Sequence, residues 1–231
     1  MNCKCVGPAG LSAAIKLKQL AALNDKEISV CVVEKGSEIG AHILSGNVFE
    51  TTALDELFPD WRLDPDVPVR TRADQDSFKI LTSEKNHFSV PSFLIPPELN
   101  NHGNYIISLS ALVRWLGGKA EELGVEIYPG FSASEVLYGA NGSVIGIATK
   151  DAGVGKDGVQ KNSFTQGIEL RARQTLFAEG ARGSCSEELI EKFGLRTGKD
   201  VQSYGRQRLG QKILSNSHYT YSYLHLKHFY D

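Results

Sequence analysis

Near the N-terminus the sequence reads Val6-Gly7-Pro8-Ala9-Gly10, and this stretch decides the fold. A dinucleotide-binding turn uses one glycine directly after the first strand, a second where the backbone nears a diphosphate, and a third where helix packs on strand. Gly7 and Gly10 fit the second and third of these positions. A helix is predicted directly after them, because apolar residues recur there at helical spacing: Leu11, Ala14, Ile15, Leu17 and Ala21.

The residues after this predicted helix support the same interpretation. Residues 28–33 form a run rich in β-branched residues, which is typical of a buried parallel strand, and Glu34 follows that run. A carboxylate at this position accepts hydrogen bonds from a ribose hydroxyl in dinucleotide-binding folds. Taken singly, each feature has a plainer explanation: a Gly-Pro turn that begins an ordinary helix, and a solvated acid at the end of a strand.

A second stretch with the features of a binding site covers residues 175–184, where an apolar strand runs into a loop of small residues that includes Gly180. In two-part flavin folds a strand of this kind returns beside the first strand, and its glycine lets the backbone approach the cofactor. Without the N-terminal turn, a core strand that ends in a glycine turn explains these residues equally well.

The remaining periodicity predicts further helices and short strands. Ala140-Asn141-Gly142-Ser143 contains the Asn-Gly pair that marks a tight β-hairpin, and residues 151–167 suit an exposed excursion between strands. Helices are predicted over residues 108–123 and 186–193. Strands are predicted over residues 125–128, 134–138, 144–149, 168–172 and 175–178.

Composition excludes several classes of function. The net charge of -2 and the pI near 6.3 provide no field that would attract a polyanion, so we expect no nucleic-acid partner. The four cysteines have neither the spacing of a disulfide framework nor that of a metal clamp. No apolar run approaches the roughly 20 residues that a membrane helix needs, and no leader or transit peptide is recognisable.

Residues 88–99 are apolar but interrupted by prolines, so they cannot form a helix. Two interpretations stay open for them. They are either a packed loop, or an apolar loop that dips into a lipid surface or guards access for a hydrophobic substrate. His102, in the Asn-rich turn that follows, is either a proton donor or simply solvated.

Together these segments resemble the electron transfer flavoprotein-ubiquinone oxidoreductase family, nearly continuously from Gly7 to about Gly205. Several stretches are specific to that family rather than shared by flavoproteins at large. The stretches that carry the resemblance are residues 7–14, 32–35, 38–42, 44–46, 57–61, 101–105, 124–130 and 176–180.

The resemblance implies an FAD site. Its diphosphate is expected at the start of the first helix, its adenosine ribose at Glu34, its flavin near residues 41–46, and its adenine at the backbone of about Val136. The residues implied as cofactor-binding are Gly7, Ala9, Gly10, Glu34, Lys35, Ala41, Ser45, Gly46, Val136, Ala178, Glu179 and Gly180. Such a site works by geometry and electrostatics around the flavin, so we expect no catalytic acid or nucleophile and no metal ligand in this chain.

The resemblance also implies an activity. Proteins of this family accept electrons from electron transfer flavoprotein, use FAD with a [4Fe-4S] cluster, and reduce ubiquinone. They work as monotopic proteins on the matrix side of the mitochondrial inner membrane, or at its bacterial counterpart. Residues 88–99 lie where this family is expected to touch lipid.

The sequence departs from the family pattern at both ends. Cys5 stands where the first glycine belongs, only residues 1–4 remain of the first strand, and residues 206–231 resemble no part of the family. The cysteines that hold the cluster are also missing, so a truncated chain is expected. Two alternatives stay open: a different FAD hydroxylase or reductase of the two-domain superfamily, and a fragment that binds nothing.

The expected fold class is α/β, with a Rossmann-type FAD-binding domain built from two sequence stretches and an inserted mixed-sheet region, incomplete at its edge. Residues 1–60 are the first part of the FAD-binding domain, and residues 61–107 are a loop-rich insertion. Residues 108–205 are the returning part with a β-hairpin, and residues 206–231 form a tail with no assigned place.

Overall fold

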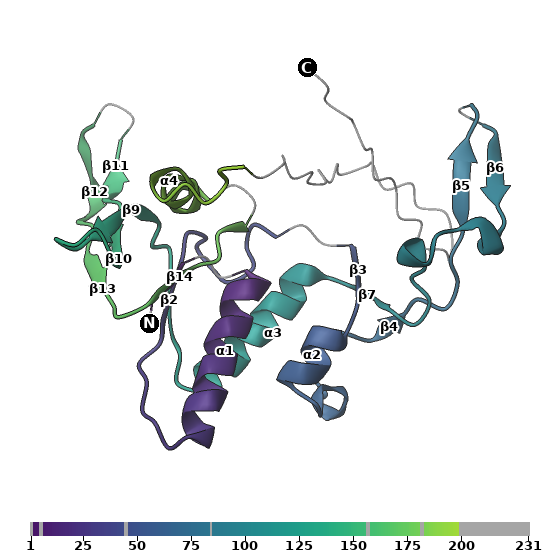
Figure 1. The fold of residues 1–231 in the computed structure, drawn as a ribbon, viewed down its shortest axis with the longest axis horizontal. Coiled ribbons are helices and arrows are strands. Elements are labelled where there is room, and N and C mark those ends of the chain that lie inside the picture. The colour runs from purple at the N-terminus through teal and green to yellow at the C-terminus, as the bar shows by residue number, and fades with distance from the viewer. Residues whose placement is uncertain are drawn as a thin grey trace.

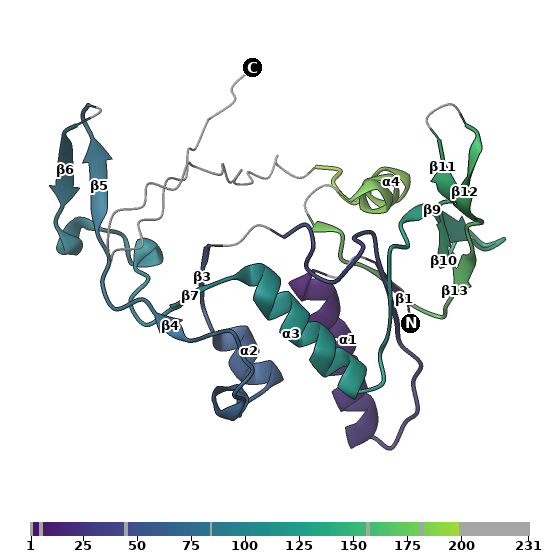
Figure 2. The ribbon, with the colours of Figure 1, turned by 180° about the vertical axis from the view of Figure 1, so that it is seen from behind.

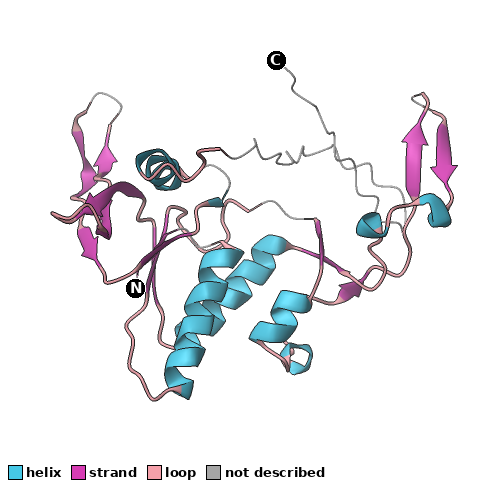
Figure 3. Cartoon of the chain, viewed as in Figure 1, coloured by secondary structure: helices cyan, strands magenta, loops and turns pink. Residues whose placement is uncertain are grey.

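The structure, a computed structural model, describes residues 2–4, 7–43, 46–83, 85–155, 158–180 and 183–198. Figure 1 shows two helices packed side by side next to a parallel sheet, with a β-hairpin projecting at each end of the molecule. Figure 2 shows the same helix pair from behind, and Figure 3 distinguishes helices from strands. Cys5, Leu44, Ser45 and the tail 206–231 lie outside the described residues.

The central sheet is assembled from strands far apart in the sequence. It contains β1 (Asn2–Lys4), β2 (Cys31–Glu34), β8 (Glu126–Pro129) and β14 (Thr175–Phe177), in the order β14-β1-β2-β8. All of its neighbouring strands run parallel. A parallel sheet built from an early and a late stretch is the predicted Rossmann-type α/β arrangement.

Helices α1 (Pro8–Leu23) and α3 (Leu109–Glu122) pack against each other at the centre of the main core. Helix α1 begins with proline in its first turn, where the missing N–H costs nothing. In α3 the side chain of Ser108 accepts a hydrogen bond from the N–H of Ala111 at 3.3 Å, which caps the helix. The most deeply buried core side chains are Leu11, Ile15, Val30, Val32, Leu112 and Val113.

A first inserted region follows β2. Strand β3 (Asn47–Phe49) and strand β4 (Thr71–Arg72) pair antiparallel with β7 (Tyr105–Ile107) on either side. Between β3 and β4 lie helix α2 (Thr52–Leu57) and the 3-10 turn η1 (Trp61–Leu63). Trp61 is buried in the main core, so this region is anchored to the α1–α3 pair.

An arm projects from this region. It consists of the antiparallel hairpin β5 (Phe78–Leu81) and β6 (His87–Val90), followed by the 3-10 turns η2 (Ser92–Leu94) and η3 (Pro97–Leu99). Figures 1 and 2 show this arm standing away from the helices. At its base, Ala73 donates to the carbonyl of Asn104 at 2.7 Å, which ties the two ends of the arm together.

The opposite end of the molecule holds a second inserted sheet. Strands β9 (Ala133–Tyr138), β10 (Val144–Thr149) and β13 (Glu169–Arg171) pair antiparallel in the order β13-β10-β9. The hairpin β11 (Ala152–Val154) and β12 (Gln160–Thr165) leaves this sheet.

Most elements predicted from the sequence are present. The hairpin around Asn141-Gly142 is confirmed, with Gly142 in the left-handed region at φ 78°. The helix predicted over residues 186–193 is α4 (Ser184–Lys192). The strand expected over residues 28–33 is regular only from Cys31 onward. The expected mixed sheet is a correction: in the described residues the inserted pairs β3–β7, β4–β7, β9–β10 and β10–β13 are all antiparallel. Each strand returns beside its neighbour in the opposite direction, through a tight turn between β9 and β10 and through longer excursions in the other pairs.

None of the helices in the described part of the chain combines the length and the apolar character that crossing a membrane requires.

Candidate nucleotide-binding site

Three of the sequence stretches predicted to bind the cofactor emerge at one edge of the central sheet. Lys4, at the end of β1, pairs in register with Val33 of β2 and with Phe177 of β14. Because these strands are parallel, the residues that follow them leave the sheet at its carboxyl edge. After β1 the chain continues to β2 on one side of it, and much later returns to β14 on the other side. Open α/β sheets bind ligands at such a switch point.

The start of α1 is open toward this edge. Gly7 is the N-cap residue, its backbone is extended (φ -89°, ψ 176°), and no heavy atom lies within 4 Å of the position that a Cβ would take. Pro8 and Ala9 are exposed, whereas Gly10 is buried. The first turn of α1 contains no acidic residue. These features fit a diphosphate, since helix N-termini carry unpaired N–H groups and partial positive charge.

Glu34, at the end of β2, has a half-buried side chain that folds back on its own turn. Its Oε1 accepts a hydrogen bond from the N–H of Gly36 at 2.5 Å. Gly36 is buried, and its carbonyl accepts from the N–H of Gly130, just after β8, at 2.7 Å. Lys35, between Glu34 and Gly36 in the sequence, has an exposed side chain. The carboxylate is therefore held at the sheet edge by the main chain.

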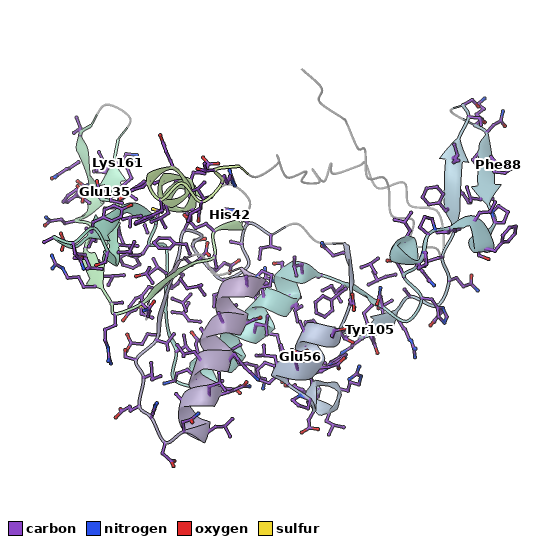
Figure 4. All side chains as sticks on the ribbon, in the orientation of Figure 1. His42, Glu56, Phe88, Tyr105, Glu135 and Lys161 are labelled. Carbon is purple, nitrogen blue, oxygen red and sulfur yellow. The ribbon has the colours of Figure 1, made fainter. Side chains whose placement is uncertain are left out.

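The stretch predicted near the flavin continues from this turn. Ala41 is exposed, and its N–H donates to the carbonyl of Glu38 at 3.3 Å; His42, labelled in Figure 4, is exposed next to it. Ser45 lies outside the described residues. Gly46 has a left-handed backbone (φ 93°), and its N–H donates to the carbonyl of Ile107 in β7 at 3.3 Å. This stretch therefore connects the central sheet to the first inserted sheet.

The loop after β14 is braced by α4. Ala178 is half-buried, and Gly180 is exposed with φ 74° and open space around it. Glu179 turns its carboxylate toward α4, where Oε2 accepts from both the N–H and the hydroxyl of Ser186 at 2.7 Å each. Its side chain thus caps a helix, and the main chain of residues 178–180 is what this loop presents to the edge.

Val136 lies on β9, with a buried side chain, opposite Ile147 of β10. The sheet of β9 packs on the central sheet through a cluster of Val33, Ala133 and Ile147, against which Phe177 also packs. β9 is the outer strand of its sheet, so one of its edges is not paired with β10. Only the backbone of Val136 is available for the adenine contact that the resemblance implies.

The remaining candidates from the sequence lie elsewhere. His102 is exposed, its Nδ1 is 3.2 Å from the carbonyl oxygen of Asp74, and it belongs to the base of the arm. Ser184 begins α4. Among the described residues, no group of three or more His, Cys, Asp or Glu side chains could hold a metal ion.

Sequence reasoning overlooked Gly36 and Gly130, which tie the end of β2 to the end of β8. The hydrogen bond between Gly36 and Gly130 joins residues far apart in the sequence, so the local sequence around Glu34 does not reveal it.

Ionisable groups with shifted pKa values lie beside the site rather than in it. Burial, with the nearby Glu126 carboxylate, raises the pKa of the Cys31 thiol to about 11. Burial and a hydrogen bond to Glu188 raise the pKa of Tyr138 to about 12. Both residues therefore stay neutral at physiological pH, and neither provides an acid or base for chemistry.

Solved structures share the fold. A flavin-dependent halogenase, CmlS, has a TM-score of 0.54 at 17% identity, over 81% of this chain and 30% of its own. THI4 of Thermovibrio ammonificans has a TM-score of 0.52 at 17% identity, over 84% of this chain and 62% of its own. A flavin-dependent brominase has a TM-score of 0.51 at 19% identity, over 83% of this chain and 39% of its own. At this identity the likeness concerns architecture alone.

No family model matches the chain. Curated relatives do, and each is named electron transfer flavoprotein-ubiquinone oxidoreductase. The protein of Arabidopsis thaliana is 57% identical over 85% of this chain and 30% of its own length. The protein of Pseudomonas aeruginosa is 56% identical over 86% of this chain and 36% of its own length. The protein of Rattus norvegicus is 53% identical over 86% of this chain and 32% of its own length. The chain thus spans about a third of the length of these relatives, and over that span it belongs to the electron transfer flavoprotein-ubiquinone oxidoreductase family.

Proposed function

We propose that this chain binds FAD at the carboxyl edge of its central sheet. The observation that carries the proposal is the register of β1, which pairs with β2 and β14 so that residues 7–10, 34–36 and 178–180 leave the sheet together. In this assignment the main chain of Gly7, Ala9 and Gly10 binds the diphosphate. Glu34, with Lys35 beside it, accepts hydrogen bonds from the adenosine ribose.

The other predicted contacts complete the assignment. Ala41, Ser45 and Gly46 lie along the stretch that would follow the flavin, and the backbone of Val136 would receive the adenine. Ala178, Glu179 and Gly180 would approach the cofactor with their main chain, since the Glu179 carboxylate is engaged by Ser186. In this assignment the main chain, together with the Glu34 carboxylate, would bind and orient the cofactor.

We further propose that the site belongs to an oxidoreductase that passes electrons from electron transfer flavoprotein to ubiquinone, as the names of the relatives state for those proteins. Bound FAD would supply the electron-carrying chemistry. The [4Fe-4S] cluster implied by the resemblance would be held elsewhere in such proteins, and we assign no ligand for it in this chain. The plant and mammalian relatives are named mitochondrial, which supports that location, with the matrix face of the inner membrane as the working surface.

The arm is proposed as the part that touches lipid. Phe78 pairs with Val90 and Ile80 with Phe88, so these four side chains share one face of the hairpin. Phe88, labelled in Figure 4, is 58% exposed. In η2 the side chains of Phe93 and Leu94 add apolar surface. Exposed apolar side chains gathered on one arm are typical of a membrane or protein contact, and they support the proposal of monotopic contact with a quinone-bearing membrane.

The FAD assignment is tested with purified protein. Flavin absorbance is expected to stay with the 231-residue chain through gel filtration. Glu34→Ala should weaken FAD binding by about 1–3 kcal/mol, because hydrogen bonds to the ribose are lost. Glu121→Ala, which removes an exposed carboxylate from α3, is the matched control and should leave affinity unchanged. Equal affinity of the Glu34 variant and wild type would show that the ribose lies elsewhere.

The arm is tested by flotation with liposomes that contain ubiquinone. Phe93→Ser and Leu94→Ser should reduce the bound fraction, because each removes an exposed apolar side chain from the arm. Leu63→Ser is the control, since Leu63 is 82% exposed, close to the 83% of Phe93, but lies on η1. A similar loss in all three variants would argue against a specific role for the arm.

A further inference from the structure

We infer that Gly36 is a positioning residue that aims the Glu34 carboxylate at the ribose of the cofactor. The inference rests on the proposed FAD site and deepens it. It concerns a residue that makes no contact with the sugar itself and acts through the side chain of its neighbour.

The geometry begins with two hydrogen bonds at Gly36. Its N–H donates to Glu34 Oε1 at 2.5 Å, and its carbonyl accepts from the N–H of Gly130 at 2.7 Å. The first bond holds the carboxylate, and the second fixes the turn to the end of β8. The carboxylate is thus attached, through Gly36, to the carboxyl edges of two neighbouring strands of the sheet.

Space rather than backbone conformation requires glycine here. Gly36 does not adopt a left-handed φ, so alanine has no backbone strain at this position. A Cβ would instead lie 3.0 Å from Glu34 Oε1, 3.1 Å from the carbonyl oxygen of Glu38 and 3.4 Å from Ala41 Cβ. The tightest of these neighbours is the end of a flexible side chain. A methyl group is therefore accommodated by moving the Glu34 carboxylate, together with a shift of a few tenths of an ångström at the Glu38 carbonyl.

Such a shift has a specific cost for ligand binding. A carboxylate that is already oriented loses little side-chain freedom when it accepts hydrogen bonds from a ligand, whereas a displaced one must be ordered again. Only ligands with ribose hydroxyls benefit from the orientation. Replacing Gly36 should therefore lower the affinity for ribose-containing ligands and leave the affinity for dideoxyribose ligands almost unchanged.

The test compares ADP with 2′,3′-dideoxy-ADP as competitors that displace FAD from the 231-residue chain, followed by flavin fluorescence. Wild type should bind ADP at least about 10-fold more tightly than the dideoxy compound. Gly36→Ala should reduce this ratio to about 2-fold or less while its thermal unfolding stays cooperative. Gly118→Ala is the control, since a Cβ at Gly118 on α3 meets nothing within 4 Å.

The outcomes separate the inference from the proposal beneath it. If the wild-type chain binds no FAD, the proposed function and the inference are both wrong. If it binds FAD but does not discriminate ADP from 2′,3′-dideoxy-ADP, the assignment of the ribose to Glu34 is wrong. A discriminating wild type with an equally discriminating Gly36→Ala variant overturns the inference alone. If Gly36→Ala does not fold, Glu34→Asp decides, because the shorter side chain cannot bond the Gly36 N–H and reach the sugar together. Retained discrimination in Glu34→Asp overturns the inference.

Discussion

Lys119 Nζ, near the end of α3, lies 3.0 Å from Oδ2 of Asp64, in the loop after η1. The Asp64 carboxylate also accepts from the N–H of Asp66 at 2.8 Å and from the indole N–H of Trp115 at 3.2 Å. This half-buried group therefore joins the first inserted region to the helix pair that packs next to the central sheet.

These contacts make stability depend on pH. The hydrogen bond from the Asp66 N–H, followed by that from Lys119, lowers the pKa of Asp64 in the folded protein. A lowered folded pKa stabilises the protein above the unfolded value near 4, and this stabilisation is lost as pH falls through the folded pKa. Asp64→Asn should therefore unfold at lower urea concentration than wild type at pH 7, and the difference should shrink below about pH 4. A constant difference from pH 7 to pH 3 would contradict this.

Glu179 should stabilise the protein through α4. Glu179→Ala removes the acceptor of the Ser186 N–H and hydroxyl at the start of the helix. The expected loss is about 1 kcal/mol of the free energy of unfolding, as for other helix N-caps, measured by urea denaturation. Glu191→Ala, at the exposed far end of α4, should change the free energy of unfolding by a few tenths of a kcal/mol at most. Equal losses in the two variants would show that capping is not the cause.

Any side chain at position 146 is expected to destabilise the folded protein. A Cβ at this position in β10 would overlap the carbonyl oxygen of Leu170 in β13, which is backbone and cannot turn aside. Gly146→Ala should lower the free energy of unfolding by about 1–3 kcal/mol, as overpacking does elsewhere. Gly118→Ala should instead be neutral or stabilise by up to about 1 kcal/mol, because alanine is the better helix former. Differential scanning calorimetry of the two variants provides the comparison.

The Cys31 thiol is expected to be unreactive in the folded protein. Its pKa of about 11 leaves little thiolate at pH 8, because burial and Glu126 disfavour the charged form. Alkylation by iodoacetamide, followed by peptide mass spectrometry, should be about 100-fold slower at Cys31 in the folded protein than in urea. Comparable rates in the two conditions would show that the strand opens readily.

Local sequence signals predicted much of the fold. Residues 108–123 have a capping serine, an apolar stripe and a following Gly124, and α3 matches that range within one residue at each end. The hairpin around Asn141-Gly142 was predicted from the turn chemistry. In both cases the determining contacts lie within a few residues, so a single stretch contains enough information.

The parts that sequence reasoning missed depend on distant partners. Residues 61–107 were predicted as loop-rich, but the pairing of the arm was not predicted, because it rests on cross-strand pairs such as Ile80 with Phe88. Glu179 was predicted as a cofactor contact because it sits in the right loop, while its bond to Ser186 depends on where α4 packs. The residues of the nucleotide-binding edge could be predicted as segments, whereas the direction of each side chain could not.

The order of the central sheet has a consequence for biosynthesis. Asn2 of β1 pairs with Cys31 on one side and with Thr175 on the other, so one edge of β1 stays unpaired until residues about 170 positions later have been synthesised. Until the ribosome has released that partner, β1 exposes an unpaired edge, and unpaired edges invite aggregation. The nascent polypeptide would therefore complete this sheet after translation of β14, which makes the last strand the step that commits it to folding.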